Sequence, residues 1–221
     1  MFKHNFVNLP NLETVEIDGR RHYITPNGAY PSITTVLSAE ESIGIKEWKS
    51  RVGEVEATRI SKIMARRGTN LHTICERYLR NESNITRGMM PDVLGIFNLM
   101  KPSLARIDEI WAIEAPLYSD KHQIAGRSDT IGLYKNTPSI IDFKTTNSDV
   151  EFTPKKIEKY FVQCKAYADM YEDRTGTKIN QGVLIIGSND FGLTTYISSL
   201  DKYFIDLEKA IKLYREKYSN A

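Results

Sequence analysis

The chain has 221 residues, of which 41% are hydrophobic, so it can bury a core without covalent cross-links. Its net charge of only +2 does not by itself indicate nucleic-acid binding, and its two cysteines, far apart in sequence, argue against a disulfide-stabilised secreted domain. No stretch has the apolar length of a signal peptide or a membrane span, so we expect a soluble protein of a reducing, cytoplasmic compartment.

The N-terminal part predicts a hairpin followed by a loop. Residues 14–25 flank Asp18-Gly19, a dipeptide that favours a tight hairpin turn. Residues 26–31 contain Asn27-Gly28 between two prolines and are expected to form a loop. The hydroxyl side chains that follow either cap a helix or bind phosphate: Ser32, Thr34 and Thr35.

Helices are expected from there to about residue 79, and the stretch 46–67 is rich in lysine and arginine. Its apolar residues are candidate buried positions: Val52, Val55, Ile60, Ile63 and Met64. The basic residues form either a solvated helix face or a surface that guides a phosphate backbone. The second interpretation is favoured because the run leads directly into Gly68-Thr69 and His72.

His72 and Glu76 lie four residues apart beside an apolar helical stripe, so they share one side of the helix. The stripe consists of Leu71, Ile74, Cys75, Tyr78 and Leu79. A histidine in such a place is more often a structural hydrogen-bonding residue than a ligand. Its role therefore depends on what the rest of the fold brings to it.

The remainder of the chain predicts an α/β order. The expected elements are a loop at 81–87, a helix or pair at 91–104, strands at 107–118, 122–134 and 139–145, a helix at 154–173, strands at 182–187 and 193–199, and a helix at 201–218. The last helix has an apolar side made of Phe204, Leu207, Ile211, Tyr214 and Tyr218. We expect a mixed central β-sheet flanked by helices, with a helical N-terminal part. We expect the chain to form a single domain, 1–221, with an N-terminal hairpin and helical part at 1–105, a core at 106–200 and a C-terminal helix at 201–221.

Two carboxylates and a lysine carry the clearest chemical signal. Asp129 lies in the first strand of a hairpin, and Asp142 and Lys144 lie in the second strand, after a turn at 135–138. Alternate strand residues share a face, so Asp142 and Lys144 point the same way. Paired acids can hold a divalent cation for phosphodiester hydrolysis, and a lysine can stabilise the developing negative charge. The alternative is a solvated edge strand, which the apolar neighbours of Asp142 argue against.

Two further segments support a site. Thr153-Pro154 predicts the start of a helix, on which Gln163 and Tyr167 share one face. Tyr160 and Tyr171 extend that face, although core packing explains these two tyrosines equally well. Glu114, in the strand before the hairpin, would alone be read as a solvated residue.

In this order, the pieces resemble the RecB-like branch of the PD-(D/E)XK nuclease superfamily, over roughly residues 31 to the 190s. The matching pieces are Gly-Thr-x-x-His, a glutamate before the hairpin, Gly-Arg-x-Asp, Asp-x-Lys and Gln-x-x-x-Tyr. Residues 31–37, Trp48 and residues 51–54 are also similar to the mitochondrial genome maintenance exonucleases and their phage and bacterial relatives. This resemblance implies a restriction-endonuclease-like core.

The resemblance also implies roles for individual residues. His72, Asp129 and Asp142, with the Phe143 carbonyl, would bind the metal. Lys144 would be the catalytic lysine, and Gln163 would line the site. Glu114 would help a second metal or support the first. The expected substrate contacts are Tyr167, Arg67, Arg127 and Thr145.

The implied activity is that of a Mg²⁺- or Mn²⁺-dependent exonuclease acting on single-stranded DNA ends in recombination, repair or replication. A structure-specific or restriction-type endonuclease and a catalytically lapsed DNA-binding module remain as alternatives. Some RecB-like relatives carry four cysteines for an iron–sulfur cluster. This chain has only Cys75 and Cys164, so no iron–sulfur cluster is expected. DNA is the expected partner, with no membrane association.

Overall fold

The computed structural model describes residues 1–40, 43–146, 153–190 and 192–218, with only the backbone of 43–47. A six-stranded sheet forms its centre, in the order β1-β5-β6-β7-β8-β9. Its strands are β1 (Lys3–His4), β5 (Ile107–Ser119), β6 (Ile124–Tyr134), β7 (Thr137–Thr145), β8 (Gln181–Ser188) and β9 (Gly192–Ser199). The pairs β1–β5 and β7–β8 are parallel and the others antiparallel. The predicted α/β fold with a mixed central sheet is confirmed.

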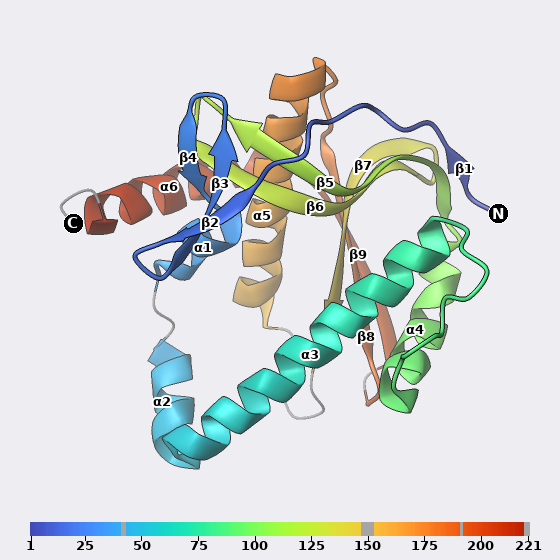
Figure 1. Cartoon of the computed structure of the whole chain (residues 1–221), viewed down its shortest axis with the longest axis horizontal. Helices are drawn as coiled ribbons and strands as arrows, with labels where there is room; N and C mark the ends of the chain where they lie inside the picture. The colour runs from blue at the N-terminus through green and yellow to red at the C-terminus, as the bar shows by residue number, and fades with distance from the viewer. Residues whose placement is uncertain (41–42, 147–152, 191, 219–221) are drawn as a thin grey trace.

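Helices cover both faces of this sheet (Figure 1). On one face lie α1 (Ile33–Ser38), α5 (Pro154–Thr175) and α6 (Phe204–Tyr218), and on the other α3 (Glu54–Leu79) and α4 (Pro91–Leu104). The alternation of β7 explains the two layers: Ile140 is buried in the α5 layer, whereas Ile141 and Phe143 are buried in the α3–α4 layer. Asp142 and Lys144 lie two and four residues after Ile140, so their side chains share its face of β7, the face towards α5.

The start of α5 follows the predicted signals. The Thr153 side chain accepts a hydrogen bond from the backbone N–H of Lys156, and Pro154 occupies the first turn. Gly176, with φ of 71°, ends the helix in the left-handed conformation. This fixes where Gln163 and Tyr167 lie along the sheet.

A second, three-stranded sheet consists of β2 (Thr14–Ile17), β3 (Arg20–Thr25) and β4 (Gly28–Pro31). The prediction of a loop at 26–31 was therefore wrong over most of its length. Gly28, with φ of 141°, lets the chain turn back at once, so that Tyr30 pairs with Tyr23. Both tyrosines are buried against β6, and this apolar contact stabilises the additional strand.

Helix α2 (Ile43–Val52) and the N-terminal half of α3 form an arm that extends away from the sheets (Figure 1). Burial was predicted for apolar residues of this arm, but Val55 is 87% exposed and Ile63 is 48% exposed. The reason is that only the C-terminal half of α3 reaches the sheet, where Leu71 and Ile74 are buried. Phe204 is likewise exposed, although the rest of its predicted stripe is buried or half-buried.

None of the helices in the described ranges has the length and apolar composition needed to cross a bilayer.

Gly126 allows β6 to approach α5 closely. A Cβ atom there would lie 2.7 Å from Cε1 of Tyr167 and 3.1 Å from Cγ2 of Ile33. Tyr167 is only 3% exposed, so its ring has little room to move. The glycine in Gly-Arg-x-Asp therefore serves the packing of Tyr167.

Gly126→Ala should lower the free energy of unfolding by about 1–3 kcal/mol, because the added methyl group overpacks a filled interface. Gly68→Ala is the matched control, since a Cβ at Gly68 meets no atom within 4 Å and alanine is the better helix former. Urea denaturation of both variants measures the effect. Equal stability of Gly126→Ala and the wild type would contradict the close packing.

Candidate active site

Strand register places three carboxylates in one row across the sheet. The last pair between β6 and β7 is Thr130–Ile141, and Asp129 and Asp142 are the residues that come directly after it on the two strands. On the other side of β6, the pairs Ile113–Thr130 and Ala115–Ser128 flank Glu114, so Glu114 lies opposite Asp129. Glu114, Asp129 and Asp142 therefore occupy adjacent strands at the same level.

Glu114 has an unusual backbone. Its φ of 52° lies in the left-handed region, which is uncommon for a residue with a side chain and costs about 1 kcal/mol or more. The neighbouring pairs Ile113–Thr130 and Ala115–Ser128 stay in register and hold this conformation in place. Such strain inside a strand is typical of residues whose side-chain direction matters.

Asp129 is held by two donors from different elements. The Nδ1 atom of His72 on α3 lies 3.2 Å from Oδ1, and the backbone N–H of Phe143 donates to Oδ2 at 2.8 Å. The second hydrogen bond lies directly after Thr130–Ile141, the last pair between β6 and β7, and continues the contact between the two strands. The structure thus brings His72 to Asp129 although 57 positions separate them in sequence (129 − 72 = 57).

Asp142 is buried and engaged by Lys144. The Nζ atom of Lys144 donates to Oδ1 at 2.8 Å and lies 2.6 Å from Oδ2. The same ammonium lies 4.8 Å from the centroid of the Tyr160 ring, within cation–π range. The expectation that Asp142 and Lys144 point the same way is met.

Gln163 and Tyr167 are both buried in the α5 layer and face the same cleft. The Nε2 atom of Gln163 donates to the Tyr167 hydroxyl at 2.9 Å. Burial raises the pKa of Tyr167 well above its usual value, so the phenol stays neutral. The pair therefore presents neutral polar groups beside the charged ones.

The crowding of charges shifts several pKa values. The Asp129 carboxylate raises the pKa of His72 to about 9, against the effect of burial. Burial, with repulsion from Asp129, raises the pKa of Glu114 to about 7. Burial raises the pKa of Asp142 to about 6, although Lys144 opposes it. Burial raises the pKa of Asp129, but the charges of His72 and Lys144 outweigh burial and hold this pKa below its usual value.

One group of these side chains has the spacing of a metal site. His72, Glu114 and Asp129 each offer a ligand atom, and these atoms lie within 4.8 Å of one another. Two carboxylates and an imidazole suit Mg²⁺ or Mn²⁺, so these donors fit a divalent cation. Glu114 joins His72 and Asp129 here, whereas Asp142 is held by Lys144. Ligation by Asp142 and by the Phe143 carbonyl stays a prediction.

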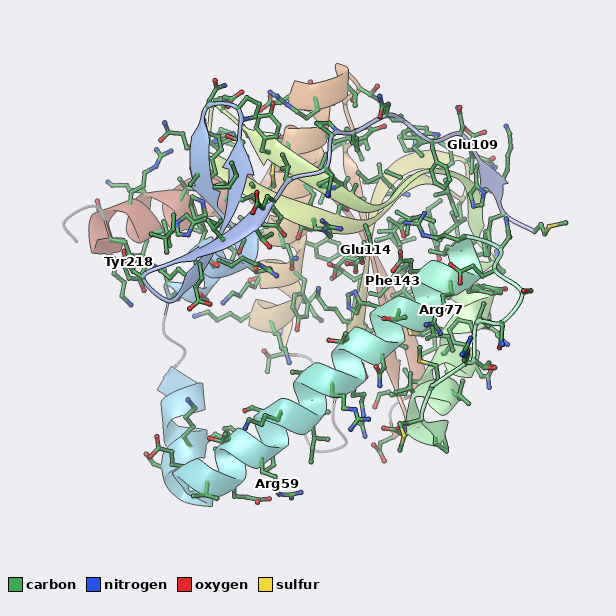
Figure 2. The ribbon with its side chains drawn as sticks, viewed as in Figure 1. Arg59, Arg77, Glu109, Glu114, Phe143 and Tyr218 are labelled. Carbon is green, nitrogen blue, oxygen red and sulfur yellow. The ribbon has the colours of Figure 1, made fainter. Side chains whose placement is uncertain are left out.

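The site opens into a cleft of about 610 Å³ between α3 and the small sheet. Figure 2 shows Glu114 and Phe143 above the C-terminal half of α3, near Arg77, whereas Arg59 lies towards the other end of the helix. The cleft is lined by His72, Thr69, Glu76, Glu114, Asp129, Lys144, Gln163 and Tyr167 on the side of the core, and by Thr14, Arg21, Tyr23, Thr34 and Arg127 towards the small sheet.

Two predicted substrate contacts lie elsewhere. The Nε atom of Arg67 donates to Asp92 of α4 at 3.1 Å, and Arg67 does not line the cleft. Thr145 is half-buried beyond Lys144 and is also absent from the lining; its Oγ1 has no hydrogen-bond partner within the described ranges. Arg127 and Tyr167 line the cleft, and their contact with substrate stays a prediction.

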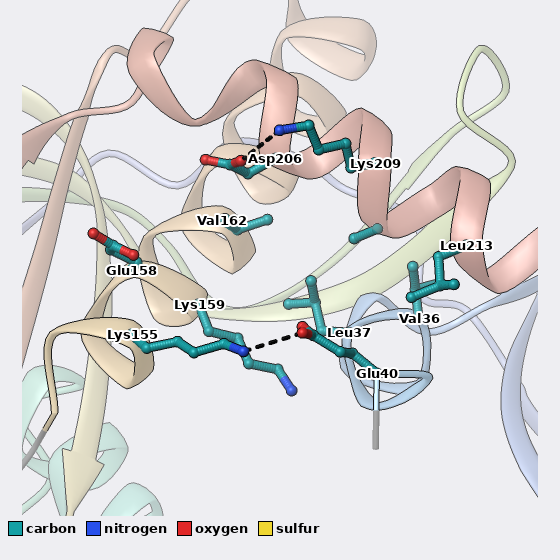
Figure 3. A pocket seen from close by; sticks show the side chains of 11 residues that line it. Val36, Leu37, Glu40, Lys155, Glu158, Lys159, Val162, Asp206, Lys209 and Leu213 are labelled. Atoms are coloured by element: carbon teal, nitrogen blue, oxygen red, sulfur yellow. Dashed lines mark hydrogen bonds and ion pairs between the residues drawn. The ribbon is translucent and has the colours of Figure 1, made fainter. Parts of the chain in front are cut away.

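A separate pocket of about 380 Å³ lies on another side of α5, against α1 and α6 (Figure 3). Its rim charges pair with one another, as in Lys155–Glu40 at 3.1 Å and Lys209–Asp206 at 3.7 Å. It contains none of the residues that approach Asp129. The cleft is therefore the candidate active site.

Sequence reasoning missed the wall that the small sheet contributes, namely Thr14, Arg21 and Tyr23. The predicted hairpin would have placed Arg21 and Tyr23 on one face of a strand. Nothing in the sequence shows that this face turns towards His72.

No protein-family model and no curated protein matches the chain. Among solved structures, it is similar to a crystal structure of a protein called SSO0001, with 18% identity and a TM-score of 0.37, over 69% of this chain and 74% of that one. It is also similar to a protein from Eubacterium rectale named "Putative exonuclease", with 8% identity and a TM-score of 0.47, over 72% of this chain and 68% of that one.

The pH dependence of stability tests the His72–Asp129 pair. The pKa of His72 is about 9 in the folded protein and about 6.5 when unfolded, so the pair stabilises fully below pH 6.5 and loses this effect as the pH rises through 9. His72→Gln removes the charge and keeps a hydrogen-bonding group. Without metal, the melting temperatures of wild type and variant should differ most near pH 6 and converge near pH 10. A difference in melting temperature that does not change with pH would contradict the ion pair.

Lys144→Met tests what Lys144 does for Asp142. The variant leaves a buried carboxylate without its partner, which should destabilise the metal-free protein by about 3–5 kcal/mol. Added Mn²⁺ should raise its melting temperature more than that of the wild type, because Asp142 becomes free to bind the ion.

Lys165→Met is the matched control, since Lys165 forms a similar ion pair with Asp169, at 2.5 Å, outside the cleft. It should lose stability with no additional response to Mn²⁺. An equal response of both variants would show that Asp142 is not near the metal.

Proposed function

We propose that this protein is a metal-dependent deoxyribonuclease that hydrolyses phosphodiester bonds at the ends of single-stranded DNA. The observation that carries the proposal is the row Glu114–Asp129–Asp142, joined by His72 on one side and Lys144 on the other. All of these residues except the buried Asp142 line a cleft large enough for part of a nucleic-acid strand.

His72, Glu114 and Asp129 would hold the cation, because their donor atoms already converge. Mg²⁺ or Mn²⁺ in this place would polarise the scissile phosphate and lower the pKa of a water molecule. Asp142 would complete the ligand set when Lys144 turns towards the substrate.

Lys144 is the group of the chain best placed to act on the phosphate. Its ammonium lines the cleft, and the nearby carboxylates raise its pKa, outweighing burial, so it remains protonated. A fixed positive charge in a partly buried site stabilises the negative charge that develops during hydrolysis. Gln163 and Tyr167 would orient the bound nucleotide with neutral hydrogen-bonding groups.

The cleft also supports treating residues 1–221 as one nuclease domain. Its lining combines residues of the N-terminal part, such as His72 and Arg21, with residues of the 106–200 core. The C-terminal helix adds Leu207 and Ile211 to the core beneath α5. The preference for single-stranded ends follows from the resemblance to the RecB-like nucleases.

End-labelled and circular single-stranded oligonucleotides with Mg²⁺ test the proposal. The wild type should degrade linear DNA from one end and leave circles intact. Asp129→Asn and Glu114→Gln should slow cleavage by about 10²-fold or more, because each removes a charged group from the site. Glu172→Gln, an exposed substitution on α5 outside the cleft, should retain activity.

The alternatives give different results. Cleavage of circles would indicate an endonuclease with the same chemistry. Binding of DNA without any cleavage would indicate a lapsed site. Wild-type rates for both Asp129→Asn and Glu114→Gln would contradict the assigned centre.

A further inference from the structure

Arg21 lies on β3 of the small sheet, its guanidinium lines the cleft, and it forms no ion pair with a carboxylate of the described residues. Its Nη2 atom donates to Oγ1 of Thr34 at 2.8 Å. The guanidinium carbon lies 5.9 Å from the centroid of the Tyr23 ring. In contrast, Arg59 pairs with Glu56 on α3, and Arg80, the residue after α3, pairs with Glu76.

The position of Arg21 is fixed relative to the catalytic strand. Its backbone carbonyl accepts a hydrogen bond from the Ser32 N–H at 2.9 Å, and Ser32 in turn bridges to Ala125 of β6. The Ser32 hydroxyl lies 2.9 Å from the hydroxyl of Thr34, which receives the guanidinium. Arg21 is thus tied at both its backbone and its side chain, which reduces the entropy lost on binding a ligand.

Arg127 adds a second positive charge to the same wall. It lies on β6, two residues before Asp129, and its Nη2 atom donates to Oδ1 of Asn11 at 3.5 Å. Within the described ranges it forms no ion pair with a carboxylate. The cleft lining therefore combines the acids Glu76, Glu114 and Asp129 with two arginines, Arg21 and Arg127.

We propose that Arg21, oriented by Thr34 and assisted by Arg127, binds the phosphate group next to the one that is cleaved. This inference rests on the proposed function, since it assumes that a nucleic-acid strand occupies the cleft. A guanidinium offers paired donors that match phosphate oxygens, and its preset orientation favours one register of the strand. The phosphate is either an internal diester or a terminal monoester.

Glu16 provides an internal test of this assignment. It lies opposite Arg21 in the pairing of β2 and β3, but the guanidinium donates to Thr34 instead. Its charge opposes the arrival of phosphate at Arg21. Glu16→Gln should therefore strengthen binding, whereas Arg21→Gln should weaken it.

Binding of a fluorescent single-stranded oligonucleotide in EDTA, where no metal supports cleavage, measures the effect directly. Arg21→Gln should weaken binding about tenfold and reduce the slope of log K against log salt by about 0.7, the value for one phosphate of a single strand. Thr34→Val should reproduce part of the loss. Lys212→Gln, an exposed substitution on α6 outside the cleft, is the charge-matched control.

A scan with one neutral methylphosphonate per oligonucleotide identifies the phosphate. In the wild type, substitution at one linkage should weaken binding, and in Arg21→Gln the same linkage should no longer matter. Oligonucleotides with phosphate or hydroxyl ends distinguish a terminal monoester from an internal diester. Unchanged linkage sensitivity in Arg21→Gln overturns the inference, even if the protein cleaves DNA.

The two proposals fail in different ways. A protein that binds DNA through Arg21 but never cleaves it refutes the nuclease and retains the phosphate site. A protein that cleaves DNA with Arg21→Gln at wild-type affinity and salt slope retains the nuclease and refutes the phosphate site. A protein that binds no oligonucleotide refutes both.

Discussion

Two ion pairs, His72–Asp129 and Lys144–Asp142, make the site possible. A carboxylate taken out of water is costly unless a positive partner or hydrogen bonds compensate it, and here two of them occupy neighbouring positions of adjacent strands. Each aspartate has its own cation: His72 reaches Asp129 from α3, and Lys144 follows Asp142 two residues later on β7. Glu114 lacks such a partner, and its pKa of about 7 reflects burial and the charge of Asp129. A divalent cation would relieve this imbalance of charge.

The fold is arranged so that these partners meet. The C-terminal half of α3 packs its apolar stripe on the sheet, which leaves His72 at the border of that packing, beside Asp129. On the other face, Gly126 lets α5 approach β6, so that Tyr167 and Gln163 reach the cleft. The small sheet covers the remaining side, and the link from Arg21 through Ser32 to Ala125 connects it with β6.

Local periodicity accounts for what could be predicted from the sequence. The side-chain alternation of β7 places Asp142 and Lys144 on one face, and the Thr153-Pro154 signal places α5, because both depend only on neighbouring residues. The meeting of His72 with Asp129 came from the resemblance, since no spacing rule links α3 to β6. The backbone of Glu114, strand β4 and the exposure of Val55 depend on tertiary packing that the sequence pattern does not reveal.

The position of a bound Mn²⁺ ion tests the central claim most directly, because anomalous diffraction from a soaked crystal locates the ion independently of any activity. We expect one ion within about 2.0–2.3 Å of a His72 ring nitrogen and of carboxylate oxygens of Glu114 and Asp129. An ion bound elsewhere at saturating Mn²⁺, with His72 still paired to Asp129, would contradict it.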